Sequence, residues 1–386
     1  MASKISWARI AATTLINDFP GEEVEIMRSR RLLALLENRG RIQFNVSGDG
    51  WRWRIRYKEP TSTPNDGTTT RSFSPFNAWK TAELSHRGYQ TTDMIQKGEL
   101  LINSGKQAVI RVKDGIKGRL SDSLRNTLSE DIYIDGDAVG NTDRLQGTET
   151  FFGISGTVDT SQSAGTTTNR SSSNQADLVG YPSDSYGGLQ TQLGYYQGAQ
   201  RNTGGSGVAA HWPNGQADSH FDFNSPIIVN YNSTSFNGAA ANWANQCIEA
   251  LRFGIIHSNR NDSKDGQLEL ILLDRFLYEQ ALNKLDAKER AIVTNTLGIR
   301  SFGFKNVFEI DGVEVSHEYG VPSGVGYGFN VNQIDLLSLQ GQLFDVDGPT
   351  WEQRTQSWNT VVDMLGNLRF RSIRNMVKWQ GITTAE

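Results

Sequence analysis

The sequence contains a single cysteine, Cys247, among 386 residues. One cysteine excludes an internal disulfide and any metal site built from several cysteines, so we expect synthesis in a reducing cytosol. No apolar run approaches the roughly 20 residues needed to span a bilayer, and the first residues lack the apolar core and cleavage site of a signal peptide. We therefore predict no contact with a membrane.

Motifs that carry catalysis or hold cofactors are also missing. The histidines have no zinc-ligand spacing, and the chain has neither a Gly-x-Ser-x-Gly nucleophile elbow nor a phosphate-binding loop. The segment 135–140 partly imitates a calcium loop, but Val139 and Gln146 stand where that loop needs ligands. We predict a turn there, no catalytic, cofactor-binding or metal-binding residues, and no enzyme activity.

Lysine is absent between Lys117 and Lys264, and charge is unevenly distributed. Residues 1–128 carry 21 lysines and arginines against 13 aspartates and glutamates, whereas the remainder carries 17 against 29. A basic front and an acidic rear can pair head to tail between copies or direct the front toward a polyanion. Chance segregation on solvated surfaces is the plainer interpretation.

The tract 153–218 has a polar composition, because 39 of its 66 residues are Gly, Ser, Thr, Asn or Gln. Such a tract can be disordered. It also contains tyrosines and Trp212, which favour burial or stacking. We therefore expect an ordered, loop-rich structure.

The segment 51–58 reads Trp-Arg-Trp-Arg-Ile-Arg-Tyr-Lys, which predicts a strand with two different faces. Side chains alternate along a strand, so one face is apolar and the other is basic. A turn-rich segment follows, and the chain returns through Arg71 to Tyr89, so we predict a projecting hairpin. The basic face can be simply solvated, can bind nucleic acid or can pair with acidic residues of an adjacent subunit.

We favour pairing between subunits, because the hairpin tip is too exposed and turn-rich to form a binding groove. The residues predicted to form this subunit interface are Trp51, Arg52, Trp53, Arg54, Arg56, Lys58 and Arg71.

A long helical stretch is predicted from about Thr92 to Leu128. Five apolar residues recur there at every fourth position: Val112, Ile116, Leu120, Leu124 and Leu128. Since a helix repeats in about 3.6 residues, each step overshoots a turn by about 40° and the apolar stripe winds around the helix. This pattern is typical of a helix lying diagonally across a sheet, whereas a coiled-coil seam alternates steps of three and four.

Other patterns predict shorter elements. A short helix runs from about Glu22 to Leu36, with Gly40 where a C-terminal stop belongs. Strand and turn are expected at 131–152, and the tail 355–380 is expected to form long antiparallel strands that turn at Gly366-Asn367. Strands and helices are also predicted at 227–229, 240–257, 268–273, 275–285, 307–310 and 313–318, the last two joined by Asp311-Gly312.

The order of these elements resembles the major capsid protein of tailed double-stranded-DNA bacteriophages, which has the Hong Kong 97-type fold. The resemblance covers essentially the whole chain. The stretches that are similar to the family are 51–54 with 71–75, 82–84 with 87–89, 131–133 with 140–141, 272–275, 311–315 and 366–370.

The resemblance implies an α+β fold with an N-terminal arm, an extended β-hairpin loop, a long spine helix in a peripheral domain, and an axial domain. It implies the arm at 1–40, the extended loop at 41–90, and the spine helix with part of the peripheral domain at 91–150. Residues 151–350 would be mainly the axial domain with a loop-rich insertion, and 351–386 the return strands of the peripheral domain.

The implied function is a structural protein that assembles into hexamers and pentamers of an icosahedral shell around packaged double-stranded DNA. The implied location is the virion, after synthesis in the host cytoplasm. The implied partners are further copies of the chain, a separate scaffolding protein, a portal, a possible cement protein, and DNA bound by non-specific charge.

Three alternatives remain open. One is a nanocompartment shell of the same fold that holds enzyme cargo. Another is a β-rich glycan-active enzyme that uses the loop-rich middle as its cleft. The third is a nucleic-acid-binding protein that acts through Arg52 to Lys58.

Overall fold

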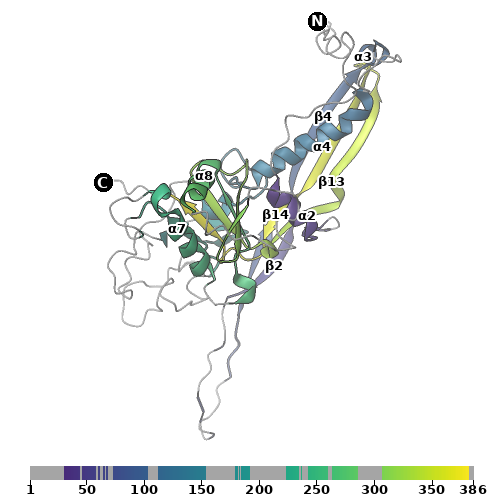
Figure 1. The fold of residues 1–386 in the computed structure, drawn as a ribbon. Helices are drawn as coiled ribbons and strands as arrows, with labels where there is room; N and C mark the ends of the chain where they lie inside the picture. The colour runs from purple at the N-terminus through teal and green to yellow at the C-terminus, as the bar shows by residue number, and fades with distance from the viewer. Residues whose placement is uncertain are drawn as a thin grey trace.

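The computed structural model describes residues 30–43, 46–57, 60, 64–65, 67, 73–102, 112–153, 179–180, 182, 184–191, 223–233, 236, 242–259, 263–285 and 307–381. These residues form an elongated part, built on a four-stranded sheet, and a rounder part, built on a seven-stranded sheet (Figure 1). Within them, no helix combines the length and the apolar character that crossing a membrane requires.

The four-stranded sheet has the order β1 (Ile42–Gln43), β13 (Ile334–Glu352), β14 (Ser357–Phe370) and β4 (Arg87–Gln96). β13 and β14 form a long antiparallel pair, with Ile334 opposite Phe370 and Glu352 opposite Ser357. β4 is antiparallel to β14 over its whole length. The sheet therefore extends well away from the rest of the molecule (Figure 1).

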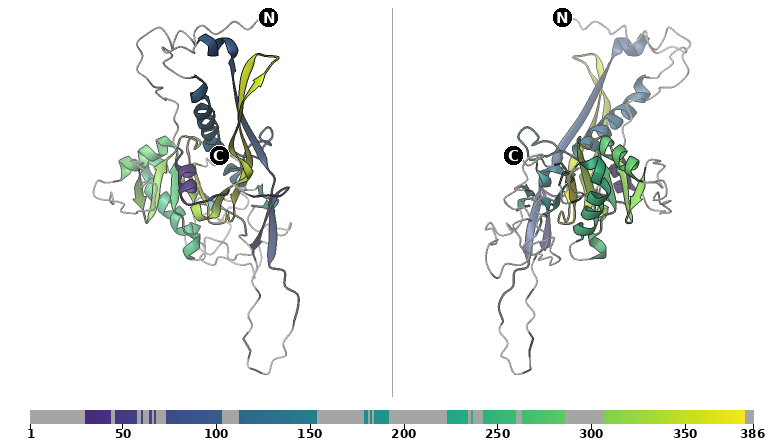
Figure 2. Two further views of the ribbon diagram at one scale, coloured as in Figure 1. Left: turned by 90° about the vertical axis from the view of Figure 1, so that its right-hand side faces the viewer. Right: turned by 60° about the vertical axis from the view of Figure 1, so that its left-hand side comes forward.

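Helix α4 (Val112–Asp131) lies along one face of this sheet and contacts β4, β14 and β13 (Figure 2). The stripe residues whose side chains are described, Ile116, Leu120, Leu124 and Leu128, are all buried. They share a core cluster with Val362 and Met364 of β14. The prediction that the stripe packs on a sheet is confirmed, because these four side chains are buried and the helix contacts three strands.

The predicted start of this helix at Thr92 is wrong. Residues 87–96 form β4, the short helix α3 (Lys97–Ile102) follows, and α4 begins at Val112. Along β4 the odd-numbered side chains are the less exposed ones, and the even-numbered side chains up to Met94 are exposed. Pairing along all of β4 with β14 outweighs local helix propensity, and threonines at 91 and 92 suit a half-buried strand.

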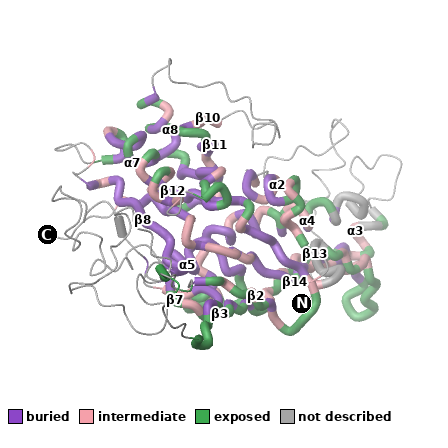
Figure 3. Tube along the Cα trace, turned by 90° about the horizontal axis from the view of Figure 1, so that it is seen from below, coloured by how far each residue is buried: buried purple, intermediate pink, exposed green. Residues whose placement is uncertain are grey.

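The seven-stranded sheet has the order β10 (Phe308–Ile310), β11 (Val313–His317), β9 (Leu270–Leu273), β12 (Val325–Phe329), β15 (Val377–Gln380), β8 (Ile227–Asn230) and β5 (Val179–Gly180). Helices α7 (Trp243–Ser258) and α8 (Arg275–Lys284) share a core cluster with Ile271 and Leu273 on one face. Leu270 and Leu272 point to the opposite face and join the core that contains the α4 stripe. Figure 3 shows buried residues along the strands of this part, whereas β3 mixes exposed residues with the buried Ala82 and Leu84.

Trp379 of β15 fills the space between the sheet and α7. Its indole Nε1 donates to the carbonyl oxygen of Ala250 at 2.9 Å. A Cβ atom on Gly254 would come within 2.3 Å of the ring, and one on Gly328 within 2.9 Å. Both glycines are therefore needed for the indole to lie this close to α7 and β12.

A buried ion pair joins β15 to the short helix α5 (Glu149–Phe152). The Lys378 Nζ atom lies 2.7 Å from Glu149 Oε1, and the Tyr327 hydroxyl donates to the same carboxylate. Burial raises the pKa of Glu149, and the attraction of Lys378 opposes this rise. The pair fixes α5 against the centre of the seven-stranded sheet.

Helix α2 (Arg31–Asn38) joins both parts of the molecule through Glu318. The buried Glu318 Oε2 accepts from the Leu32 amide at 3.3 Å and from the Tyr133 hydroxyl at 3.0 Å. Burial raises the pKa of Glu318 to about 7. Gly40 follows the helix with a φ of 63°, as predicted. The predicted single helix from Glu22 is wrong, because α2 begins at Arg31 after the non-helical Arg30, and residues 1–29 lie outside the described residues.

The predicted turn at Gly366-Asn367 is wrong. β14 continues through both residues, and the chain reverses direction between β13 and β14 at 353–356 instead. A Cβ atom on Gly366 would lie 2.4 Å from the Leu337 carbonyl oxygen. The glycine is therefore required by a close approach of β13, and not by a turn.

The strand predicted near residue 132 is wrong as well, because α4 continues to Asp131 and turns lead from there to α5. The predicted hairpin at Asp311-Gly312 is confirmed, with φ values of 49° and 83°. The strands and helices predicted between 227 and 318 are confirmed with boundaries shifted by up to three residues. Most of the tract 153–218 lies outside the described residues.

Candidate subunit interface

Strands β2 (Trp51–Arg56) and β3 (Trp79–Leu84) form the predicted antiparallel hairpin. Trp51 lies opposite Leu84 and Arg56 opposite Trp79. The hairpin leaves the molecule at the end remote from α3 (Figure 1). The predicted alternation of faces is confirmed, because Arg52, Arg54 and Arg56 are exposed while Trp51 and Tyr57 are buried. Lys58 and Arg71 lie outside the described residues.

The apolar face of the hairpin contacts its own chain. The Trp51 ring meets the His86 ring edge-on at 4.4 Å between centroids, and Trp53 Nε1 donates to the Arg371 carbonyl oxygen at 3.3 Å. These contacts fix the direction in which the hairpin leaves the body, so the two tryptophans are not free to meet another copy.

The opposite face carries Arg52, Arg54 and Arg56 from β2 together with Trp79 and Glu83 from β3, and we call it the basic hairpin face. Arg52 forms a two-point ion pair with Glu83, at 2.9 Å from Nε to Oε2 and 3.0 Å from Nη2 to Oε1. Both side chains are exposed, so this pair adds little to stability. Arg54 has no acidic partner among the described residues.

Trp79 was not predicted from the sequence as an interface residue, but the structure makes it a candidate. Its side chain is 53% exposed on the basic hairpin face, directly opposite Arg56. Arg52 pairs with Glu83, and Trp79 lies four residues before Glu83 on the same strand. Because side chains alternate along a strand, Trp79 must lie on the same face as Arg52, and the sequence could have predicted this. A large exposed aromatic ring beside arginines is typical of protein–protein contacts.

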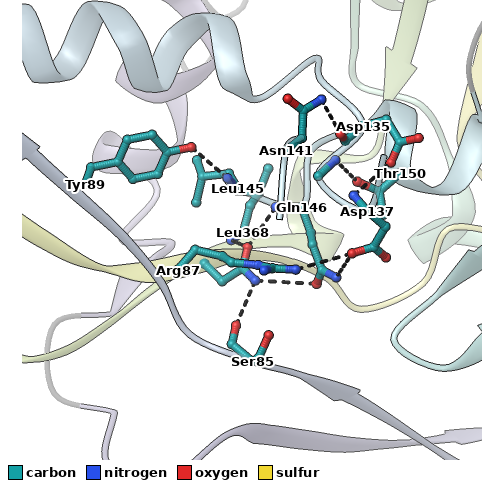
Figure 4. Close-up of polar contacts among 12 residues, drawn as sticks. Ser85, Arg87, Tyr89, Asp135, Asp137, Asn141, Leu145, Gln146, Thr150 and Leu368 are labelled. Atoms are coloured by element: carbon teal, nitrogen blue, oxygen red, sulfur yellow. Dashed lines mark hydrogen bonds and ion pairs between the residues drawn. The ribbon is translucent and has the colours of Figure 1, made fainter. Parts of the chain in front are cut away.

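A polar network holds the base of the hairpin (Figure 4). Arg87 and the Gln146 side chain both donate to Asp137 Oδ1, at 3.3 and 2.7 Å. The Asn367 side chain donates to the Ser85 carbonyl oxygen at 2.9 Å and accepts from the Gln146 amide at 3.0 Å. These hydrogen bonds connect the loop between α4 and α5 to β14 and to the residues between β3 and β4.

The hairpin is also supported from the side by the two-stranded turn β6 (Ser185–Tyr186) and β7 (Leu189–Gln190). The Gly187 carbonyl oxygen accepts from the Glu83 amide at 3.0 Å. The Tyr186 hydroxyl accepts from the Phe370 amide at 3.0 Å and donates to the Leu368 carbonyl oxygen at 3.1 Å. β3 is therefore linked to β14 through a segment that lies far away in sequence.

A second exposed surface lies on the four-stranded sheet, on the face opposite α4. Asp345, Asp347 and Asp363 lie on it together with the exposed side chains of Met94 and Leu365, and we call it the acidic sheet face. Asp345 stands directly opposite Asp363, an arrangement that is unfavourable for like charges. None of the three carboxylates forms an ion pair with another described residue. A cationic partner would remove this repulsion.

Neither surface suggests metal chemistry. Within the described part of the chain, no three His, Cys, Asp or Glu side chains come close enough together to hold a metal ion. Cys247 is buried, and burial raises the pKa of its thiol to about 11. It packs as a small apolar side chain on the buried side of α7.

No protein-family model matches the chain, and a search of curated proteins finds no similar sequence. Solved structures are similar over almost its whole length. A subunit of the cyanophage A-1(L) capsid matches with a TM-score of 0.58 and 13% identity, covering 96% of this chain and 98% of that one. The protein has the Hong Kong 97-type capsid fold.

Two further structures agree with this capsid fold. The capsid of a native GTA particle matches with a TM-score of 0.52 and 9% identity, covering 96% of both chains. The capsid of cyanophage P-SCSP1u matches with a TM-score of 0.51 and 12% identity, covering 96% of this chain and 94% of that one. The α+β class and the fold predicted from the sequence are confirmed. One fold can serve several functions, so the function of this chain depends on the surfaces that its own residues form.

Proposed function

We propose that this chain is a major capsid protein, which assembles into hexamers and pentamers of an icosahedral shell around double-stranded DNA in a virion. The observation that carries the proposal is the match of the whole chain to the whole of a capsid subunit. Two exposed surfaces of opposite charge, which cannot neutralise each other within one copy, give it a physical basis.

In the terms of the capsid fold, we assign α4 as the spine helix, β2 and β3 as part of the extended loop, and residues 1–40 as the arm. The seven-stranded sheet would belong to the axial domain. The two long return strands are β13 and β14, and β15 pairs in the seven-stranded sheet. We therefore place the peripheral return strands at 334–370, earlier than the 351–386 expected from the sequence.

The interface we propose joins the basic hairpin face of one copy to the acidic sheet face of the next. Arg54 and Arg56 would meet Asp345, Asp347 and Asp363, and Trp79 would cover Leu365. The hairpin extends away from the four-stranded sheet, so the two faces are separated within one chain (Figures 1 and 2). Complementary charges at such an interface mainly fix the orientation of the partners and speed their association, because the cost of removing the charges from water offsets much of their attraction.

The predicted interface residues then divide into two groups. Arg52, Arg54 and Arg56 would contact the neighbouring copy, whereas Trp51 and Trp53 would aim the hairpin by their contacts with their own chain. Lys58 and Arg71 stay predictions, as do a scaffolding protein, a portal and a cement protein as partners.

Electron microscopy of the purified protein, expressed with and without its neighbouring genes, tests the proposed function. We expect closed shells, rings of five or six subunits, or tubes. Monomers under every assembly condition would contradict it. The content of native particles separates the two shell alternatives, because DNA supports a capsid whereas protein cargo without DNA supports a nanocompartment.

A further inference from the structure

Three arginines converge on one fully buried carboxylate at the base of the four-stranded sheet. Arg369 donates to Asp335 Oδ2 through Nη2 at 2.6 Å and Nε at 3.2 Å. Arg371 binds both carboxylate oxygens through Nε and Nη2. Arg41 Nη1 lies 3.6 Å from Asp335 Oδ1. Among the described residues, Asp335 is the acidic partner of all three arginines, so two positive charges are left uncompensated.

The arginines have unused donors that reach water. Neither Arg369 nor Arg371 uses its Nη1 in a hydrogen bond with a described residue. The Arg369 side chain is 18% exposed and the Arg41 side chain 25% exposed. The Arg371 side chain is 39% exposed. Asp335 therefore orients guanidinium groups whose outer edges remain available.

The positions of these arginines are fixed by the backbone. Arg369 lies directly opposite Asp335 in the pairing of β14 with β13. The Arg371 amide donates to the Gln333 carbonyl oxygen at 2.8 Å, and its carbonyl oxygen accepts from Trp53 Nε1. The Arg41 carbonyl oxygen accepts from the Leu336 amide at 3.0 Å. A ligand would thus meet guanidinium groups that need little further ordering.

We propose that Arg41, Arg369 and Arg371 form a binding site for phosphate groups. Guanidinium forks match the oxygens of a phosphate, and they bind it more strongly than neutral donors do. Two surplus charges side by side fit a phosphate dianion or two consecutive phosphodiesters, whereas one carboxylate from a second copy would leave one charge unbalanced. The phosphate can come from nucleic acid or from free inorganic phosphate, and only the first source rests on the proposed function.

DNA binding by dilute, unassembled protein tests the first source. We expect Arg371→Gln to weaken binding of a labelled DNA duplex and to make the dependence of log affinity on log salt shallower by about 0.9, the slope of one phosphate contact. Arg252→Gln is the matched control, because Arg252 is an exposed arginine paired with Asp311 at 3.5 Å and outside the cluster. It should lower DNA affinity less than Arg371→Gln does.

A thermal unfolding series tests the second source. Inorganic phosphate, compared with chloride at equal ionic strength, should raise the melting temperature of the wild type and of Arg252→Gln. The melting temperature of Arg371→Gln should rise by less. DNA binding lowered without a phosphate effect would assign the site to nucleic acid, and a phosphate effect without altered DNA binding would assign it to the free ion. Should Arg371→Gln fail to fold, Arg41→Gln and phosphate titration of the wild type take its place.

The proposal is overturned if phosphate shifts no melting temperature and Arg371→Gln binds DNA as the control does. It is also overturned if Arg371→Gln loses only shell formation, because the cluster would then serve a carboxylate of another copy. Micrographs of the same preparations keep the two proposals distinct. Shells that form while the arginines bind no phosphate reject the site alone, and monomers that bind phosphate reject the capsid function alone.

Discussion

The two sheets of this chain use their faces differently. In the seven-stranded sheet, strands such as β9 are buried at every residue, because helices cover one face and the main core covers the other. In the outer half of the four-stranded sheet, α4 covers one face, and the other is exposed and carries three aspartates that form no ion pair with another described residue. The first sheet stabilises the subunit, and we propose that the exposed face of the second contacts another copy.

The largest expected effect is the loss of Trp379 from the seven-stranded sheet. Trp379→Ala removes a fully buried indole and its hydrogen bond to Ala250, and leaves a cavity against α7. We expect the free energy of unfolding to fall by about 3–5 kcal/mol, measured by urea denaturation of the unassembled protein. A loss below about 1 kcal/mol would show that this sheet is not where stability resides.

Breaking the buried ion pair should have an effect of similar size. Lys378→Met leaves Glu149 buried without its cation, so we expect a loss of about 3–5 kcal/mol at pH 7. The loss should shrink in acid, where Glu149 becomes protonated. Urea denaturation at pH 7 and pH 5 measures both values. Arg252→Gln, which breaks an exposed pair, should cost less than about 1 kcal/mol.

The pH dependence of stability should reveal Glu318. Its pKa is about 7 in the folded chain against 4.5 for an ordinary glutamate, so the folded chain binds this proton more tightly. Glu318 should therefore lower the free energy of unfolding by up to about 3 kcal/mol as pH rises from 4.5 to 7. His317, whose pKa burial lowers to about 4, should act in the opposite direction, so the Glu318 contribution is the difference between wild type and variant. Glu318→Gln should remove this decline, as followed by denaturation at pH 5, 6, 7 and 8. An unchanged slope would contradict the assignment.

The smallest effect on stability is expected on the acidic sheet face. Leu365→Ala shortens a side chain that is 38% exposed, so the free energy of unfolding should fall by no more than about 1 kcal/mol. The same substitution should lower the yield of shells or rings, because Trp79 of a neighbouring copy loses its contact. Sedimentation of assembly reactions measures the yield. A large loss of stability together with normal assembly would contradict the proposal that this face serves assembly and not the stability of the subunit.

Part of this arrangement of buried and exposed faces could be predicted from the sequence. The alternation at 51–58 gave the two faces of the hairpin, and the four-residue spacing from Ile116 to Leu128 gave a helix crossing several strands. Both are periodic patterns within one element, which depend on burial alone. The resemblance to capsid proteins gave the fold, which no single pattern would have specified.

What the sequence did not reveal depends on contacts between distant segments. Gly366-Asn367 has the composition of a turn, and only the approach of Leu337 shows why glycine is needed there. Thr92 lies in a strand because β14 pairs with it. The acidic sheet face unites Met94, Asp345, Asp347, Asp363 and Leu365, so only the register of three strands could have identified it.

Charge reversal across the proposed interface tests the central claim most directly. Arg54→Glu and Asp363→Arg should each reduce assembly while leaving the free energy of unfolding nearly unchanged, because neither side chain has an ionic partner among the described residues. The double variant should regain assembly, since the two charges exchange places across the contact. Sedimentation and electron microscopy of all four proteins measure this. Single variants that assemble normally, or a double variant no better than either, would contradict the account.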